Sequence, residues 1–548
     1  MIKSRIAWLF TIAIFLGSIS ALAQTPVVVL EGGTLIDGTG RNPISDAVVV
    51  IEGNRIKSVG TKGQVSYPSN ARVINTDGKT ILPGLVDGHV HLDIYFPSYM
   101  PQMLLHYGVT TMADLNNDTD WILLQRDLLN SGKSRGPRMF VSGEALDGPT
   151  SVTNTDERVV VHSLKTPEEA RAQVRSLVAK GVDMVKTNYT LTFEQLAAIL
   201  DEAKKANVPV VGHTRNMRKA AELGMKYMEH MNTVAWAVLD DDMGYERWQR
   251  EGFTPERRMD TSKFPSLVDF MVKQGVFINP TLVNNWRTAT PRAKEMSDTA
   301  NQILKDPTLT AIAPAGAQQA WKNLSSGRNP DVAGYNKVKD FVSQYVNAGG
   351  KIAAGTDEGG VSMPGLSLHY EMQMITDMGI SPMKAIQAAT LWSAESFGQG
   401  KNVGSIEPGK FADFMIIEGN PLNDIMATRN VKMVIKGGQV MDTAYDAKAL
   451  TSVSRPFGTL PKVNSISPAV AKEGAQNVML QIDGTRFSPK SVVRIENRDL
   501  PTQFVSATKL TATVEAPLLQ KAGSYALYVV NPGAGGASNN VYLFVGPK

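Results

Sequence analysis

Histidine is scarce in this chain, and its positions suggest a metal site. The 548 residues include seven histidines and no cysteine. Without thiols the chain can form neither disulfides nor zinc–thiolate sites, so a bound metal would need imidazole, carboxylate or less usual ligands. His89 and His91 stand two residues apart in a strand-like run, and alternate residues of a strand share one face. Their imidazoles are therefore expected to point the same way and to bind one metal ion.

Four further candidate ligands stand at the ends of other apolar segments: Lys186, His213, His230 and Asp357. Taken singly, such a histidine or lysine is more often structural or solvated. Taken together, these residues and the His89/His91 pair end five different strand-like segments. Enzymes built on a parallel barrel place their catalytic groups at the carboxyl ends of the strands, so the coincidence favours one metal-binding rim.

The sequence pattern of the central region predicts such a barrel. Short apolar runs alternate with helix-period segments, which is typical of parallel strands joined by right-handed crossovers. Thr166 followed by Pro167, and Thr192 with Gln195, mark helix starts. Long insertions precede the last two strands and are expected to shape a lid or pocket. The eight expected strands are 85–91, 109–115, 138–143, 183–188, 208–214, 227–231, 276–282 and 351–357.

The segments before and after the predicted barrel have other sequence patterns. Lys3 and Arg5 precede a short apolar run, and Ala21-Leu22-Ala23 fits a cleavage site, so residues 1–23 are expected to be a signal peptide of a periplasmic or secreted protein. An uncleaved membrane anchor is the alternative. Strand-like runs broken by turns flank the barrel, and another such unit follows residue 460. The formal net charge of +4 gives no electrostatic case for nucleic acid.

Several of these segments carry a family resemblance. They resemble the metal-dependent amidohydrolase superfamily, in its imidazolonepropionase-like branch with Xaa-Pro and Xaa-Arg dipeptidases and ochratoxin-type amidases. The resemblance spans about residues 26–442. It implies a distorted (β/α)8 TIM barrel, an α/β fold, at residues 81–399 beside a β-sandwich built from residues 24–80 and 400–445. The segments that carry it are 83–91, 108–111, 354–357 and 404–413.

The resemblance also implies roles for the candidate ligands. In binuclear members, His89 and His91 would hold the more buried metal with Asp357, and His213 and His230 would hold the second. Lys186, carboxylated by CO2, would bridge the two ions. Mononuclear relatives and many deaminases lack this lysine. The implied cofactors are therefore two divalent metal ions, expected to be Zn²⁺, and a carbamate on Lys186.

The final unit, residues 461–548, resembles an IPT/TIG-type immunoglobulin-like domain. The match lies in residues 465–468, 484–487 and 523–532. Domains of this type mediate contacts and hold no catalytic groups. A surface or protein contact through this unit, and a homo-oligomer, are both compatible with the sequence.

The expected reaction is hydrolysis of an amide in a dipeptide or N-acyl amino acid. A metal-activated hydroxide would attack the carbonyl, and Asp357 would act as general base and then acid. Tyr189 and His369 are candidate substrate contacts; His106 and His162 are expected to be structural. Alternatives are a lactonase or esterase, a mononuclear cyclic-amide hydrolase in the same site, or a non-catalytic binding protein with an immunoglobulin-like module.

Overall fold

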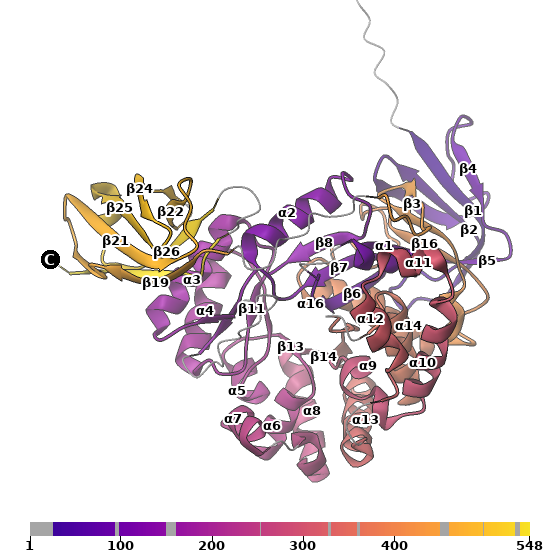
Figure 1. Ribbon diagram of the computed structural model, residues 1–548. Helices are drawn as coiled ribbons and strands as arrows, with labels where there is room; N and C mark the ends of the chain where they lie inside the picture. Colours follow the sequence, from indigo (N-terminus) through magenta and orange to yellow (C-terminus); the bar gives the residue numbers. More distant parts are fainter. Residues whose placement is uncertain are drawn as a thin grey trace, which may run out of the picture.

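The computed structural model describes residues 26–93, 98–148, 161–251, 254–326, 330–358, 362–449, 460–496, 498–531 and 537–547. The expected signal peptide lies outside these residues. A central α/β body carries a β-sheet on one side and a β-sandwich on the other (Figure 1). Among the described helices, none has the length and apolar character needed to cross a bilayer.

Parallel strands form the central body. They are β6 (Leu85–Val90), β7 (Val109–Asp114), β8 (Arg138–Val141), β9 (Ala145–Asp147), β10 (Val161–Ser163), β11 (Val185–Thr187), β12 (Val210–Gly212), β13 (Tyr227–Glu229), β14 (Phe277–Asn279) and β15 (Lys351–Ile352). One ladder runs β6-β7-β8, and the other runs β10-β9-β11-β12-β13-β14-β15. The eight predicted segments are all strands, although most are shorter than expected.

The barrel closes at two irregular seams. A parallel bridge between Val90 and Glu358 joins β6 to the segment after β15. On the other side, the Asp183 amide donates to the Val141 carbonyl at 2.9 Å, which joins β8 to the start of β11. The third predicted strand, 138–143, corresponds to β8 alone, and neither β9 nor β10 was foreseen from the sequence. The barrel is accordingly distorted.

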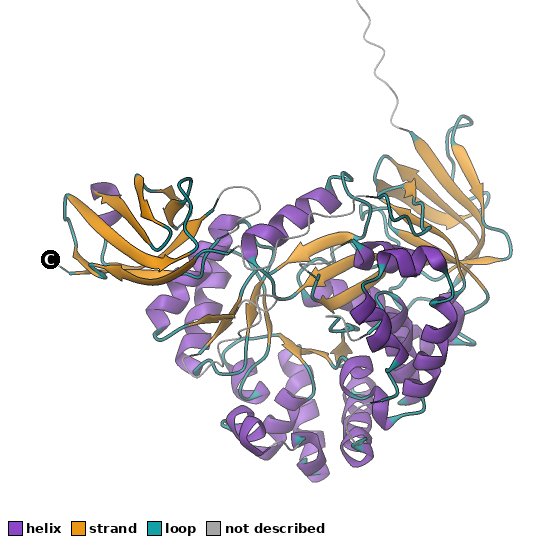
Figure 2. Ribbon diagram, viewed as in Figure 1, coloured by secondary structure: helices purple, strands orange, loops and turns teal. Residues whose placement is uncertain are grey.

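Helices cover the outside of these strands (Figure 2). The predicted helix starts are confirmed: Thr166 accepts a hydrogen bond from the Glu169 amide, and Thr192 with Gln195 forms a capping box. The long insertions fold into α7 to α13 with three 3₁₀ turns. The helices are α1 (Tyr99–His106), α2 (Thr119–Asn130), α3 (Pro167–Lys180), α4 (Phe193–Lys205), α5 (Met217–Glu222), α6 (Asn232–Leu239), α7 (Gly244–Glu251), η1 (Pro255–Arg258), η2 (Thr261–Lys263), α8 (Phe264–Gln274), α9 (Leu282–Asn285), η3 (Arg287–Ala289), α10 (Arg292–Ile303), α11 (Pro307–Ile312), α12 (Ala315–Lys322), α13 (Val332–Asn347), α14 (Leu366–Asp377), α15 (Pro382–Gln387), the π-helix η4 (Ala388–Trp392) and α16 (Ser393–Ser396).

Both flanks of the barrel join in one eight-stranded sheet. Its strands are β1 (Val27–Leu35), β2 (Ile44–Glu52), β3 (Arg55–Thr61), β4 (Arg72–Asn75), β5 (Lys79–Pro83), β16 (Phe414–Glu418), β17 (Val431–Lys436) and β18 (Gln439–Val440). β16 pairs with β5 antiparallel, with Ile416 opposite Ile81. Since β5 leads directly into β6, this pairing of distant segments fixes the start of the strand that carries His89 and His91.

The C-terminal unit is a β-sandwich of two sheets, β19-β21-β25-β24 and β20-β27-β26-β22-β23. Its apolar core lies between the sheets. The strands are β19 (Lys462–Ser467), β20 (Val470–Lys472), β21 (Asn477–Thr485), β22 (Val492–Ile495), β23 (Arg498–Asp499), β24 (Thr502–Ser506), β25 (Lys509–Glu515), β26 (Gly523–Val530) and β27 (Val541–Gly546).

This sandwich packs directly on the barrel through α3 and β26. The Lys180 ammonium lies 3.9 Å from the centre of the Tyr528 ring, a cation–π contact. Arg175 Nε lies 3.4 Å from Glu496 Oε1. The side-chain oxygen of Gln173 accepts hydrogen bonds from both the Asn540 side-chain amide and the Tyr542 hydroxyl, and burial raises the pKa of Tyr542. The sandwich and the barrel therefore meet through specific polar and cation–π contacts.

Ending the chain after residue 460 should lower thermal stability and leave catalysis largely intact. The deletion uncovers α3, whereas every candidate ligand precedes residue 358. We expect Tm to fall by roughly 2–4 °C for each kcal/mol of interface free energy lost. Circular dichroism melting, metal analysis and turnover measure the three effects. A folded, metal-loaded but inactive truncation would show that the sandwich contributes to the active site.

Candidate metal centre

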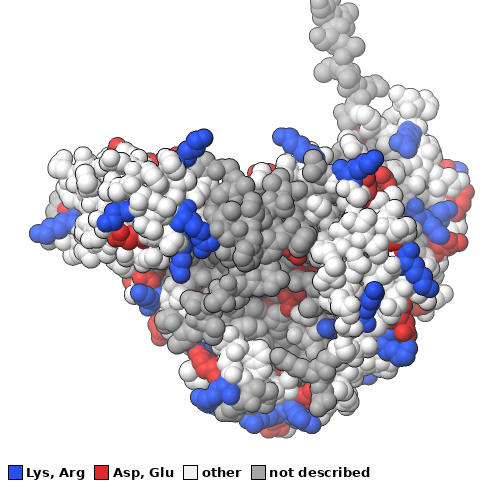
Figure 3. Space-filling model, viewed as in Figure 1, with Lys and Arg blue, Asp and Glu red and all other residues white. Residues whose placement is uncertain are grey.

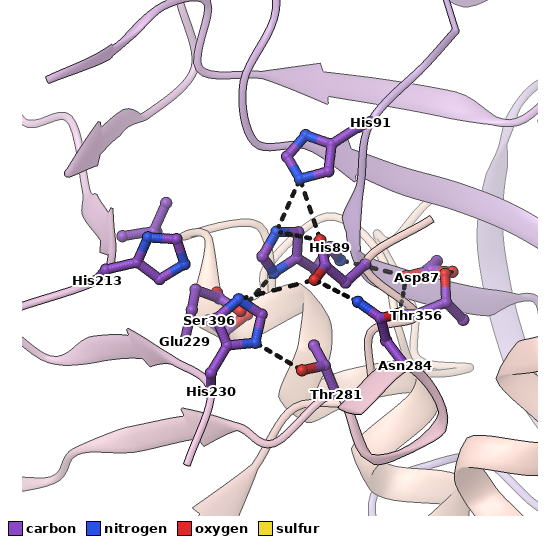
Figure 4. Close-up of polar contacts among 12 residues, drawn as sticks. Asp87, His89, His91, His213, Glu229, His230, Thr281, Asn284, Thr356 and Ser396 are labelled. Carbon is purple, nitrogen blue, oxygen red and sulfur yellow. Dashed lines mark hydrogen bonds and ion pairs between the residues drawn. The ribbon is translucent and has the colours of Figure 1, made fainter. Parts of the chain in front are cut away.

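Three candidate ligands meet where β6 and β15 end. His89 and His91 Nε2 lie 3.3 Å apart, and Asp357 Oδ1 lies 3.4 Å and 3.1 Å from them. The three residues offer ligand atoms that all lie within 4.8 Å of one another. The close-up shows both rings directed toward one point (Figure 4). This is the first of the two groups expected from the sequence.

The other two candidate histidine ligands, His230 and His213, lie beside this group. His230 Nε2 is 3.8 Å from Asp357 Oδ2, and the His230 ring centre lies 5.2 Å from that of His89. The His213 ring follows at 4.9 Å from His230. Lys186, on β11, is buried among these residues: its charge lowers the pKa values of His89 and His213. The structure thus places His230, His213 and Lys186 beside the group formed by His89, His91 and Asp357.

In each of the four candidate histidine ligands, Nδ1 lies within hydrogen-bonding distance of a protein group. His89 Nδ1 lies 2.7 Å from Glu229 Oε2, and His91 Nδ1 lies 3.4 Å from a backbone carbonyl. The corresponding distances are 2.8 Å from His213 to Asn188 Oδ1 and 2.6 Å from His230 to Thr281 Oγ1. A partner at Nδ1 sets the tautomer and leaves Nε2 free to bind a metal. All four rings therefore turn the same kind of nitrogen toward the centre.

The backbone is constrained where the ligands leave the barrel. His230 and Asp357 both have left-handed φ angles, 63° and 51°, which are uncommon for residues with a Cβ. Gly355 precedes Asp357 and lies so close to β6 that a Cβ would stand 2.8 Å from the Cβ of His89. A side chain at Gly355 would push the two ligand-bearing segments apart, so this glycine sets their spacing.

Electrostatics keep three of the four candidate imidazoles in the neutral form that binds metals. At His91, burial would lower the pKa, but Asp357 outweighs it and raises the pKa. Burial lowers the pKa of His89 and His213 well below the ordinary histidine value, and lowers that of His230 to about 4. These rings are neutral at physiological pH, as a ligand must be. Burial would raise the pKa of Asp357, but His89 and His91 outweigh it and hold the pKa well below its usual range. The carboxylate is therefore ionised.

Two buried atoms of the centre have no hydrogen-bond partner among the described residues: Lys186 Nζ and His213 Nε2. An unpaired buried polar group costs about 1–3 kcal/mol. A divalent cation would satisfy His213 Nε2, and a carboxylated amine at Lys186 would turn a donor into an anionic ligand. The donor set, four imidazoles and a carboxylate, suits zinc and similar ions. The residues therefore fit a metal.

A pocket of about 320 Å³ opens beside the centre. Its wall includes Asp357 and His230 from the centre, and the rest comes mainly from the inserted helices. The lining residues are Tyr189, His230, Met231, Asn232, Trp248, Thr254, Pro255, Glu256, Asn285, Trp286, Thr288, Ala289, Asp331 and Asp357. That size and mixed polarity suit a small organic molecule.

The two candidate substrate contacts differ in position. Tyr189 lines the pocket, and its ring stacks on His213 at 4.0 Å. His369 is fully buried in α14, where its ring nitrogens lie 2.8 Å from Thr428 Oγ1 and 2.9 Å from the Tyr107 carbonyl. Its contacts hold α14 against the 3₁₀ turn η5 (Ile425–Arg429), so His369 has a structural role and we do not place it in the substrate site.

Several functional residues were not identified from the sequence. Glu229 could have been suspected, because it precedes His230 on a buried strand. Asn284 donates to Asp357 Oδ2 at 2.7 Å from α9, inside an insertion without a recognisable motif. Glu371 accepts from the first two amides of α9, at 2.9 and 2.7 Å, and so fixes the helix that carries Asn284. Thr281 lies just before that helix.

Comparisons with known proteins match most of the chain. The model of the family described as "Amidohydrolase family" matches residues 80–441, and that of the IPT/TIG domain matches residues 461–544. The chain is similar to an imidazolonepropionase of Geobacillus thermodenitrificans, with 25% identity over 73% of this chain and 90% of the relative. It is 24% identical to an ochratoxinase of Aspergillus niger, over 77% and 88%. A solved Xaa-Pro dipeptidase with bound methionine in its active site superposes with a TM-score of 0.55, at 24% identity over 76% of this chain and 100% of that one.

Replacing Glu229 by Gln should weaken metal binding about 10–100-fold, because it removes the negative charge behind His89 while keeping an acceptor of the same shape. Competition with a chelator measures the affinity. Glu515→Gln, an exposed carboxylate of the C-terminal sandwich, is the matched control. Equal metal affinity in the Glu229 variant and the parent would show that this contact does not tune the centre.

Proposed function

Because this chain belongs to the amidohydrolase family, whose members are metal-dependent hydrolases acting on C–N bonds, we propose that it hydrolyses the amide of a dipeptide or an N-acyl amino acid. The observation that carries the proposal is the convergence of the Nε2 atoms of His89, His91 and His230 on Asp357, with the His213 ring beside them, next to a pocket of small-molecule size. The Xaa-Pro dipeptidase among its structural neighbours supports a dipeptide.

We propose that two divalent ions, expected to be Zn²⁺, are held by this chain. His89, His91 and Asp357 would hold one, and His213 with His230 the other. Burial lowers the pKa of Lys186, which favours the neutral amine that reacts with CO2. A carbamate there would supply two anionic oxygens between the two histidine groups. The unpartnered Lys186 Nζ supports this modification.

When bound, the ions would polarise the scissile carbonyl and lower the pKa of a water molecule toward neutrality. Asp357 then moves the proton. Its Oδ1 faces His89 and His91, and Asn284 holds its Oδ2 at 2.7 Å. Because Asp357 is ionised and lines the pocket, it can accept the proton of the attacking water and deliver it to the leaving nitrogen.

Tyr189 is positioned to act on the carbonyl oxygen. Its hydroxyl oxygen accepts from the Asn232 amide at 3.1 Å, which leaves the hydroxyl proton available. Burial raises the pKa of Tyr189 far above its ordinary value, so the group stays protonated and can donate. We propose that it donates to the oxyanion of the tetrahedral intermediate. Its stacking on His213 and on Tyr245, at 4.7 Å, fixes the ring.

We also propose that the protein works outside the cytoplasm, in a periplasm or as a secreted enzyme. The support is the basic, apolar and small-residue pattern of residues 1–23. Sequencing the N-terminus of protein from the native host locates the cleavage site.

The proposed function is tested with a pooled library of dipeptides and N-acyl amino acids, using protein of known metal content. Lys186→Ala should lower the bound metal from about two ions to one or none per chain, with loss of turnover. Acetate or propionate should then restore part of the activity, because a small carboxylate can replace the carbamate oxygens in the vacated space.

Lys204→Ala, an exposed lysine of α4, is the matched control and should change neither metal content nor rate. Two bound ions and normal turnover in Lys186→Ala would overturn the carbamate bridge and favour a mononuclear site. A fully metal-loaded parent that cleaves no amide in the library would contradict the proposed function itself.

A further inference from the structure

The substrate pocket contains a buried carboxylate that the proposed chemistry does not use. Glu256, in η1, is 5% exposed and lines the pocket together with Asp357. No other residue in the described part of the chain donates a hydrogen bond to its carboxylate or forms an ion pair with it. A buried acid without a partner is costly unless a ligand or a proton compensates its charge. Glu256 accepts only its own backbone amide among the contacts that lower its pKa, so its charged form needs a ligand and its ligand-free form is favoured by a proton.

The cations near Glu256 are engaged elsewhere. Lys337, on α13, donates to the carbonyls of Arg257 and Met259 at 2.9 and 2.7 Å. The Arg257 side chain is 68% exposed, and its Nε lies 3.8 Å from Asp331, not at Glu256. None of the described residues that line the pocket is Lys or Arg. Among the described residues of the pocket wall, none supplies Glu256 with a counterion.

A second acid adds negative charge to the same wall. Asp331 caps α13, with Oδ1 accepting from the Gly334 amide at 2.9 Å and Oδ2 accepting from the Thr254 hydroxyl. Burial, with Asp331 as a like charge, raises the pKa of Glu256 to about 7. A cation placed between the two carboxylates would reverse that penalty. On the face drawn in Figure 3, acidic atoms are visible within the central hollow.

The rest of the pocket suits an organic cation. Trp248 and Trp286 line it, and Tyr189 lies near the catalytic end. Aromatic faces attract ammonium and guanidinium groups and pack on the methylenes that carry them. A neutral or anionic side chain would leave Glu256 uncompensated.

We propose that the pocket selects amide substrates carrying an organic cation, an ammonium or guanidinium group, that pairs with Glu256 while the scissile carbonyl lies at Asp357. The inference rests on the proposed amide hydrolysis and names its substrate class. The cation could be a lysine or arginine side chain or a free α-amino group. Both present the same chemistry to the carboxylate, and the experiment separates them.

The test compares matched substrate pairs with metal-loaded parent enzyme. Gly-Arg is paired with Gly-citrulline, and Gly-Lys with its ε-acetyl form, to test the side-chain cation. Ala-Met with and without N-acetylation tests the α-amine. We expect kcat/KM to be at least about tenfold higher for the cationic member of one pair. The pair that responds identifies the source of the cation, and equal rates within every pair overturn the proposal.

Glu256→Gln supplies the matching change in the protein. It should lower kcat/KM for the cationic substrate at least about tenfold more than for the neutral partner, and Asp298→Asn, an exposed acid of α10, should change neither. Equal loss for both substrates would show a structural role and contradict the proposal. Competitive inhibition of the parent by L-arginine but not L-citrulline tests the pocket without a variant. Metal-loaded enzyme that cleaves no amide but discriminates these two inhibitors would refute the proposed function and leave the cation site standing.

Discussion

The barrel brings several polar side chains together at the candidate metal centre. Each of these side chains needs a hydrogen-bond partner or a bound metal ion. His89 and Lys186 are buried and the other three imidazoles and Asp357 are partly buried, and two atoms of this group lack a hydrogen-bond partner among the described residues. Such an arrangement is unfavourable for a closed core and favourable for a metal centre. The Nδ1 partners, the left-handed turns at His230 and Asp357, and Gly355 all serve this convergence.

Contacts outside the ligand group also hold the ligand-bearing segments in place. Asp87, beneath His89 on β6, accepts from the Thr356 hydroxyl at 2.7 Å and from the Thr356 amide at 3.0 Å. This contact ties the first ligand strand to the segment that carries Asp357. Burial raises the pKa of Asp87 to about 7, while these hydrogen bonds favour its charged form. The antiparallel pairing of β5 with β16 then anchors β6 from outside the barrel.

The sequence was informative wherever chemistry restricts residue type. Strand ends bearing His, Lys or Asp predicted six candidate ligands that the fold places in one region, and alternation of strands and helices predicted the barrel. The partners of those ligands were not foreseen, because an asparagine or threonine such as Asn284 has no distinguishing pattern until the fold brings it near. His369 misled because proximity in sequence to Asp357 says nothing about which face of α14 it occupies. Glu256 lies in an insertion whose path depends on packing.

The most direct test of the account is anomalous X-ray diffraction at the zinc edge from crystals of the metal-loaded protein. The account predicts two peaks per chain, roughly 3.5–4 Å apart. One should lie among His89, His91 and Asp357 and the other beside His213 and His230, with density for a carboxylated Lys186 between them. A single peak, or two peaks with an unmodified amine pointing away from them, would contradict the binuclear centre.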